Sequence, residues 1–166
     1  MLHEIPPTAN GEPKWDITRD DMDAFGVRSQ TYAARATAEG RFEREILPVV
    51  DAEGKTMTTD EGIRDTTRES LGALKPAFRP EEEGGRVTAG NSSQITDGAS
   101  AVLIMSEEKA NELGLTPRAR FVNFGLAGDN PRFMLTAPIP ATQKALAKAG
   151  LTMADISVTE INEAFA

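Results

Sequence analysis

Hydrophobic positions in the first part of the chain predict one long helix followed by short elements. One face of this helix is formed by Met22, Phe25, Ser29, Tyr32 and Ala36, which recur every three or four residues. Thr18 supplies an N-cap before the pattern, and Gly40 ends it. Residues 45–50 then predict a short edge strand, because Pro48 bars it from the centre of a sheet. Residues 56–65 indicate a loop, and residues 69–74 indicate a short helix.

Beyond Arg86 the chain is less charged, and strand-like and helix-like patterns alternate. Strands are predicted at 101–105, 120–124 and 155–161, of which the first is apolar enough to be buried on both faces. Helices are predicted at 107–113, capped by Ser106, and at 141–149, ended by Gly150. We expect Asn162 to begin a further helix. This alternation is typical of a layered α/β fold.

Composition argues against nucleic acid and membranes as partners of this chain. The formal net charge of −8 argues against nucleic-acid binding, which depends on a surplus of Lys and Arg facing phosphates. No apolar run approaches the ~20 residues that a membrane-spanning helix needs, so we expect no membrane association. Because the first residues do not have the pattern of a secretory signal, a cytoplasmic location is the default expectation.

The near absence of sulfur and imidazole nucleophiles excludes several kinds of site from these residues. The chain has no cysteine, which rules out disulfides, thiolate–zinc sites and a thiol nucleophile within it. His3 is the only histidine, and we expect it to be solvated. The sequence therefore predicts no metal site.

Two short stretches carry polar groups suited to ligand binding. Residues 89–93, Ala-Gly-Asn-Ser-Ser, offer hydroxyl and amide groups on a small-residue loop, although an ordinary turn fits them equally well. Asn162 follows a predicted strand at the end where α/β sheets place functional residues. Its amide is suited to donate to a developing oxyanion, while helix capping is the competing interpretation.

Three motifs, in order, resemble the thiolase family. Residues 87–99 (VTAGNSSQITDGA) resemble the thiolase segment that leads from the loop domain back into the core. Residues 129–134 (DNPRFM) with 137–142 (APIPAT) resemble the segment near the substrate tunnel, and residues 162–166 match the NEAFA motif. Weaker similarity around residues 40–49 and 74–78 extends the resemblance over most of the chain, with residues 1–16 matching least.

The resemblance implies a partial thiolase-like α/β fold, with a loop domain and parts of two layered α/β halves. Residues 1–94 would form most of the CoA-binding loop domain, 95–117 the end of the N-terminal half, and 118–166 the start of the C-terminal half. The complete protein is then expected to be a homo-oligomer, either a dimer or a tetramer.

The resemblance also implies an acyl-CoA C-acyltransferase, which makes or cleaves the carbon–carbon bond of 3-ketoacyl-CoA through a cysteine acyl-enzyme. The nucleophilic cysteine and the acid–base histidine and cysteine are expected outside this chain, so the chain alone is expected to be inactive. CoA and its thioesters are the expected partners, as substrates, with no separate cofactor. Two alternatives stay open: a non-catalytic acyl-CoA-binding protein and an inactive remnant.

Specific residues inherit roles from the resemblance. Asn162 would take the catalytic role by holding a water of the oxyanion hole. Ser93 would contact the pantetheine arm. Arg64 and Ser70 would face the nucleotide end of CoA. The tunnel walls would be formed by Phe78, Met134, Ala164 and Phe165.

Overall fold

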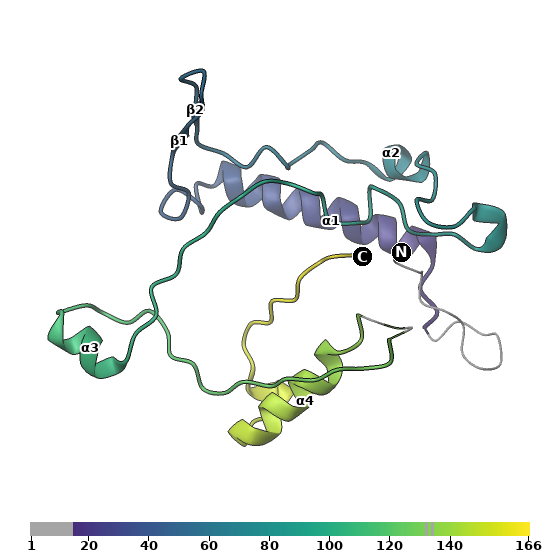
Figure 1. Cartoon of the computed structure of the whole chain (residues 1–166). Coiled ribbons are helices and arrows are strands. Elements are labelled where there is room, and N and C mark those ends of the chain that lie inside the picture. Colours follow the sequence, from purple (N-terminus) through teal and green to yellow (C-terminus); the bar gives the residue numbers. More distant parts are fainter. Residues whose placement is uncertain (1–14, 132, 134) are drawn as a thin grey trace. The chain divides into compact units, whose positions relative to one another are not determined.

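The computed structural model describes residues 15–131, 133 and 135–166, and the chain divides into two units (Figure 1). The first unit contains the residues up to Thr96 together with Asn162–Ala166, and the second contains Asp97–Ile161. The expectations for His3 and Met134 lie outside the described residues.

Helix α1, Arg19–Ala38, runs through the first unit and begins where the sequence predicts (Figure 1). The Thr18 hydroxyl accepts from the Asp21 N–H at 3.1 Å, and the Asp21 carboxylate accepts from the Thr18 N–H at 2.9 Å. This reciprocal capping box satisfies amides at the start of the helix. Hydrogen bonds from the Thr18 side chain and then its backbone lower the pKa of Asp21 below 3.8.

The buried face of α1 differs from the predicted one at two positions. Tyr32 was expected inside but is 54% exposed, so that prediction is wrong. Asp23 is instead the buried residue of this helix. The reason is that the chain around Asn91 contacts α1 at Asp23 and buries a polar group there through a hydrogen bond.

A small hairpin follows α1. Strands β1, Val49–Val50, and β2, Thr56–Met57, pair antiparallel with Val49 opposite Met57. The predicted strand at 45–50 therefore forms only at its end, and β2 was missed within a segment predicted as loop. The Asp51 side chain makes the turn, because its Oδ1 accepts from the Glu53 and Lys55 amides at 3.0 and 2.8 Å.

Helix α2, Arg68–Gly72, confirms the predicted short helix, and η1, Glu81–Glu83, is a single 3₁₀ turn. The Arg19 guanidinium on α1 donates to the carbonyls of Leu71 and Leu74 at 2.7 and 3.0 Å. These carbonyls lie at and beyond the C-terminal end of α2, where carbonyls no longer accept from the amide four residues later in a helix. Arg19 thereby joins α2 to α1.

The second unit contains α3, Glu107–Glu112, α4, Pro138–Ala149, and the 3₁₀ turn η2, Met153–Asp155. Both helices confirm the sequence predictions, including the Ser106 cap and the left-handed Gly150. Helix α4 begins three residues earlier than predicted, since proline is compatible with a first helical turn. Its least exposed side contains Ala141, Ala145, Leu146 and Ala149, the face that the pattern indicates.

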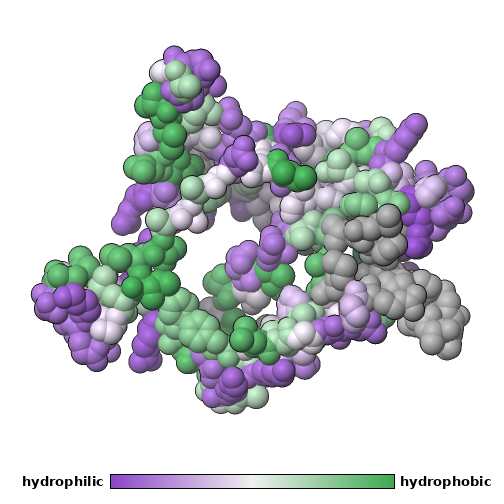
Figure 2. Space-filling view, in the orientation of Figure 1, coloured by the Kyte–Doolittle hydropathy of each residue, from purple (hydrophilic) through white to green (hydrophobic). Residues whose placement is uncertain are grey.

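The predicted strands at 101–105, 120–124 and 155–161 do not form within the described residues. These segments are largely extended and exposed, with Val102 at 81% and Val158 at 85%. Figure 2 shows apolar surface on the chain flanking α3. The patterns are those of buried strands, but a strand needs hydrogen-bonded neighbours, and the described residues of this unit supply none. No helix of the described part is long and apolar enough to cross a membrane.

Candidate functional site

The centre of the first unit is a buried polar network around Asn91. The Asn91 side-chain amide donates to Asp23 Oδ1 at 3.0 Å and to the Arg86 carbonyl at 3.1 Å, and its Oδ1 accepts from the Thr88 N–H at 2.8 Å. Arg19 pairs with the other oxygen of Asp23 at 2.8 Å. Thr88 is fully buried, and Asp23 and Asn91 are each 4% exposed. This network fixes the loop that begins at Thr88 against α1.

Two glycines let that loop approach α1 and α2 closely. A Cβ on Gly26 of α1 would lie 2.7 Å from the Gly90 carbonyl oxygen. A Cβ on Gly90 would collide with the side chains of Leu71 and Leu74. Because neither position has room for a methyl group, glycine sets the separation between the loop and the two helices.

The last residues of the chain pair with this loop. Ser92 and Phe165 form an antiparallel bridge. The Ser93 N–H donates to the Ala164 carbonyl at 2.9 Å, and the Ala166 N–H donates to the Asn91 carbonyl at 2.9 Å. The pairing brings Asn162 next to a loop some seventy residues earlier in the sequence. Because these residues are extended, the helix expected to begin at Asn162 is absent, and that prediction is wrong.

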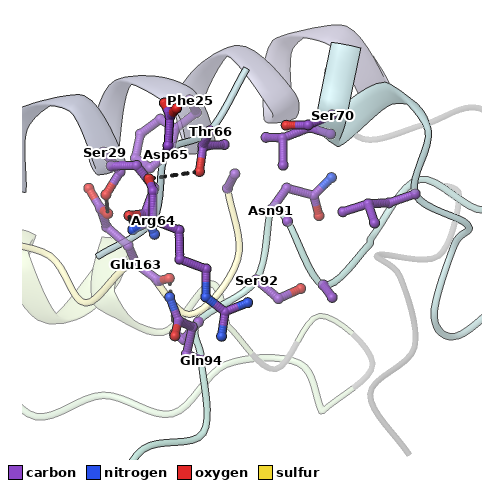
Figure 3. A pocket seen from close by; sticks show the side chains of 18 of the residues that line it. Phe25, Ser29, Arg64, Asp65, Thr66, Ser70, Asn91, Ser92, Gln94 and Glu163 are labelled. Atoms are coloured by element: carbon purple, nitrogen blue, oxygen red, sulfur yellow. Dashed lines mark hydrogen bonds between the residues drawn. The ribbon is translucent and has the colours of Figure 1, made fainter. Parts of the chain in front are cut away.

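These elements enclose a cleft of about 480 Å³ in the first unit (Figure 3). Its polar lining comes from α1, the segment before α2, the 89–94 loop and the C-terminal residues. The lining residues are Phe25, Gly26, Ser29, Gln30, Arg64, Asp65, Thr66, Ser70, Leu71, Leu74, Ala89, Gly90, Asn91, Ser92, Ser93, Gln94, Asn162, Glu163 and Ala166. Four of the residues predicted from sequence therefore meet in one cleft: Asn162, Ser93, Arg64 and Ser70.

Asn162 and Ser93 differ in what they can offer a ligand. Asn162 is exposed, and its amide forms no hydrogen bond with the described residues, so its donors and its acceptor are all free. The Ser93 hydroxyl donates to the Glu163 carbonyl at 3.2 Å. Since that proton is engaged, the Ser93 oxygen is left to accept a hydrogen bond from a ligand N–H.

Arg64 and Ser70 line the cleft from the side of α2. The Arg64 backbone is anchored by its N–H, which donates to Gln30 Oε1 on α1 at 2.9 Å. Its guanidinium forms no ion pair within the described part of the chain and extends toward Gln94 (Figure 3). The Ser70 hydroxyl donates to the Thr67 carbonyl at 3.0 Å as part of the α2 cap. Arg64 is thus the cation of this cleft that is available to an anionic group.

The residues expected to wall a tunnel lie elsewhere. Phe78 and Phe165 contact each other edge to face, with ring centroids 6.2 Å apart. The Ala164 carbonyl accepts a hydrogen bond from the Ser93 N–H. None of these three residues lines the cleft. Met134 lies outside the described residues, and its neighbours belong to the second unit. Their roles in a tunnel stay predictions.

Sequence reasoning missed two contributors to the site. Asn91 was considered only as part of a turn or ligand loop, whereas its side chain points into the interior toward Asp23. Glu163 was not considered, yet its carboxylate accepts from the Ser29 hydroxyl at 2.6 Å (Figure 3). No local signal indicated the first, because Asp23 does not belong to the helix face that the pattern predicts to be buried. The described residues contain no cluster suited to hold a metal ion.

Two family models and several curated relatives match this chain. Residues 8–108 match the model of the thiolase N-terminal domain, and residues 115–166 match that of the thiolase C-terminal domain. The chain is 56% identical to a 3-ketoacyl-CoA thiolase of Saccharophagus degradans and 52% identical to an acetyl-CoA acetyltransferase of Syntrophomonas wolfei. The matches cover 90% and 92% of this chain, which spans only 39% and 38% of those relatives.

Solved structures agree with the family models. The acetyl-CoA acetyltransferase of Bacillus anthracis matches with a TM-score of 0.84 at 43% identity, over 90% of this chain and 38% of that one. Human mitochondrial 3-ketoacyl-CoA thiolase in complex with CoA matches with a TM-score of 0.84 at 40% identity, over 90% of this chain and 37% of that one. The dimeric peroxisomal thiolase of Saccharomyces cerevisiae matches with a TM-score of 0.84 at 41% identity, over 90% of this chain and 38% of that one. With a partial thiolase-like α/β fold and both family models matched, this chain belongs to the thiolase family.

Proposed function

We propose that this chain supplies part of the substrate site of an acyl-CoA C-acyltransferase that makes or cleaves the carbon–carbon bond of 3-ketoacyl-CoA. The observation that carries the proposal is the meeting of Asn162, Ser93 and Arg64 in one cleft, from three distant parts of the sequence. One relative of similar structure is a thiolase in complex with CoA, which supports a CoA thioester as the ligand.

The polar groups of the cleft match the parts of a CoA thioester. Pantetheine carries amide N–H groups, and the Ser93 oxygen is left to accept from one of them. The nucleotide end carries phosphates, for which the unpaired guanidinium of Arg64 is a suitable partner. The Asn162 amide is free to hold a water that donates to the enolate oxygen as negative charge develops there.

The covalent chemistry must come from residues outside this chain. A thiolase acylates a cysteine thiolate, and the chain has no cysteine. The chain alone is therefore proposed to bind CoA without turnover, using CoA as a substrate and no separate cofactor. In the complete protein, we propose a homo-oligomer. The cytoplasmic location expected from the sequence stays a prediction.

A chimera tests this function directly. The part of this chain that matches the Saccharophagus degradans relative, 56% identical over 155 residues, would replace its counterpart in that relative. The account expects CoA-dependent cleavage of acetoacetyl-CoA, and a loss of about 100-fold in kcat on Asn162→Ala, as for removal of one oxyanion-hole donor.

The outcomes of this assay separate the three readings. A folded chimera that cleaves substrate supports the enzyme. A folded chimera that binds acetyl-CoA without turnover contradicts the proposed catalysis and favours a non-catalytic acyl-CoA-binding protein. A folded chimera with neither property indicates an inactive remnant.

A further inference from the structure

The position of Asn162 depends on its neighbours, because its own side chain is tethered to none of the described residues. It precedes the paired segment in which Ser93 bonds to Ala164 and Ala166 bonds to Asn91, each at 2.9 Å. These two bonds restrain the backbone at Ala164 and Ala166, which follow Asn162, and they do not restrain the backbone of Asn162 itself. A second restraint, closer to Asn162, is needed to orient the Asn162 side chain toward the cleft.

Glu163 supplies that restraint, since it is held at two atoms. Its backbone carbonyl accepts from the Ser93 hydroxyl at 3.2 Å, and its carboxylate accepts from the Ser29 hydroxyl at 2.6 Å. Ser29 lies on the cleft side of α1, which is itself anchored by the buried Asp23–Asn91 bond. A hydroxyl–carboxylate hydrogen bond is charge-assisted and therefore stronger than a neutral one.

We propose that Ser29 and Glu163 are positioning residues for Asn162. The Ser29–Glu163 bond connects α1 to the C-terminal segment across 134 residues of sequence. Helix α1 holds the Glu163 side chain and the loop holds the Glu163 carbonyl. The orientation of the Asn162 backbone, which directly precedes Glu163, is thereby set. The inference rests on the proposed function, because it concerns how Asn162 is presented to a CoA thioester.

The test uses the full 166-residue chain with CoA as the probe. Hydrogen–deuterium exchange of residues 162–166 reports the order of the segment, and calorimetry reports the affinity for CoA. Ser29→Ala and Glu163→Ala are each expected to speed exchange in residues 162–166 and to weaken CoA binding about fivefold to tenfold, as for one lost hydrogen bond. Glu163→Gln is expected to stay within about twofold of the unsubstituted chain, since an amide oxygen still accepts from Ser29.

The double variant and a control separate positioning from general destabilisation. Ser29→Ala combined with Glu163→Ala should be no worse than either alone, because both remove the same bond. Thr31→Ala removes a hydroxyl of α1 whose one partner among the described residues is the Val27 carbonyl of its own helix, and it should leave both readouts unchanged.

Unchanged exchange in residues 162–166 of Ser29→Ala would overturn the inference, whatever the affinity. Additive effects in the double variant would overturn it too. Should the unsubstituted chain fail to bind CoA, the proposed function falls, while the exchange data still decide whether Ser29 and Glu163 order the segment. Ser29→Ala deletes a single oxygen, so it keeps the test valid if Glu163→Ala does not fold.

Discussion

Asn91 connects helix α1 to the backbone of residues 86–88 through one side chain. Its amide and carbonyl satisfy Asp23, Arg86 and Thr88, all of which approach it in a buried region. An asparagine is suited to this position because it donates and accepts at once. The loop that carries Ser93 is therefore held in place by a buried side chain.

Replacing Asn91 should destabilise the loop that carries Ser93, because several buried groups depend on this one side chain. Asn91→Ala leaves a buried carboxylate oxygen and a buried amide without their partner, and each such loss costs roughly 1–3 kcal/mol. We expect faster hydrogen exchange across residues 86–94 and a lower urea midpoint. Asn111→Ala on the exposed side of α3 is the matched control, with an effect within about 0.5 kcal/mol. Exchange in residues 86–94 equal to that of the unsubstituted chain would contradict this role.

At this scale the sequence identified several cleft residues but not their contacts. Asn162, Ser93, Arg64 and Ser70 were predicted through motifs, and they do meet. The Asp23–Asn91 and Ser29–Glu163 bonds were not foreseen, because each joins residues 68 or 134 positions apart. Side-chain partners at such separation follow from the tertiary path and leave no local pattern.

Helix caps are the elements that the sequence predicts best, since their causes are local. Thr18, Ser106 and Gly150 act where expected. Strands depend on neighbours far away, and the three predicted in the second unit have none among the described residues. The same pattern of alternating elements thus identified the fold class while overstating the paired strands.

The cap of α1 makes the helix sensitive to acid. Hydrogen bonds from Thr18 lower the pKa of Asp21 below 3.8, so the charged form is stabilised in the folded chain. This contribution is present above pH 3.8 and is lost as the pH falls through the lowered pKa.

Thr18→Ala should raise the pKa of Asp21 toward 3.8, because the larger of the two hydrogen-bond contributions is removed. A titration of the carboxyl carbon by NMR measures this change. The pKa of Asp155, lowered by the backbone and then the side chain of Thr152, is the internal control and should not change. An Asp21 pKa that stays where it is would show that the Thr18 hydroxyl does not donate to the Asp21 carboxylate.

Packing between α1 and the 88–93 loop reverses the usual effect of a glycine substitution. Alanine in place of glycine normally favours a helix by about 1 kcal/mol. At Gly26 the new methyl group would meet the Gly90 carbonyl at 2.7 Å, so Gly26→Ala should lower the thermal midpoint. Gly72→Ala on α2 has nothing within 4 Å and should hold or raise that midpoint. Equal effects of the two substitutions, measured by circular dichroism, would contradict close packing at Gly26.

Both units leave apolar residues exposed, among them Leu47 at 81% in the first and Val102 at 81% in the second. In the first, helices and loops pack around a polar network and a cleft. In the second, extended apolar segments on both sides of α3 are exposed (Figure 2). The chain spans only 39% and 38% of the two curated relatives that it matches.

Exposed segments of this kind should be detectable in solution. We expect the amides of residues 101–105 and 120–124 to exchange rapidly, and the chain to bind a fluorescent dye specific for apolar surface. The Ser93 amide should exchange slowly by comparison, because it donates to the Ala164 carbonyl. Slow exchange in residues 101–105 would show that these segments find partners, for example in a second copy.

The central claim is that the cleft lined by Ser93, Arg64 and Asn162 takes a CoA thioester, and mapping the ligand on the chain tests it most directly. Hydrogen exchange of the 166-residue chain would be compared with and without saturating acetyl-CoA. We expect slower exchange in residues 62–66, 88–94 and 162–166, with residues 107–112 unchanged, and loss of the effect on Arg64→Ala. Protection confined to other residues, or none at concentrations where binding is saturated, would contradict it.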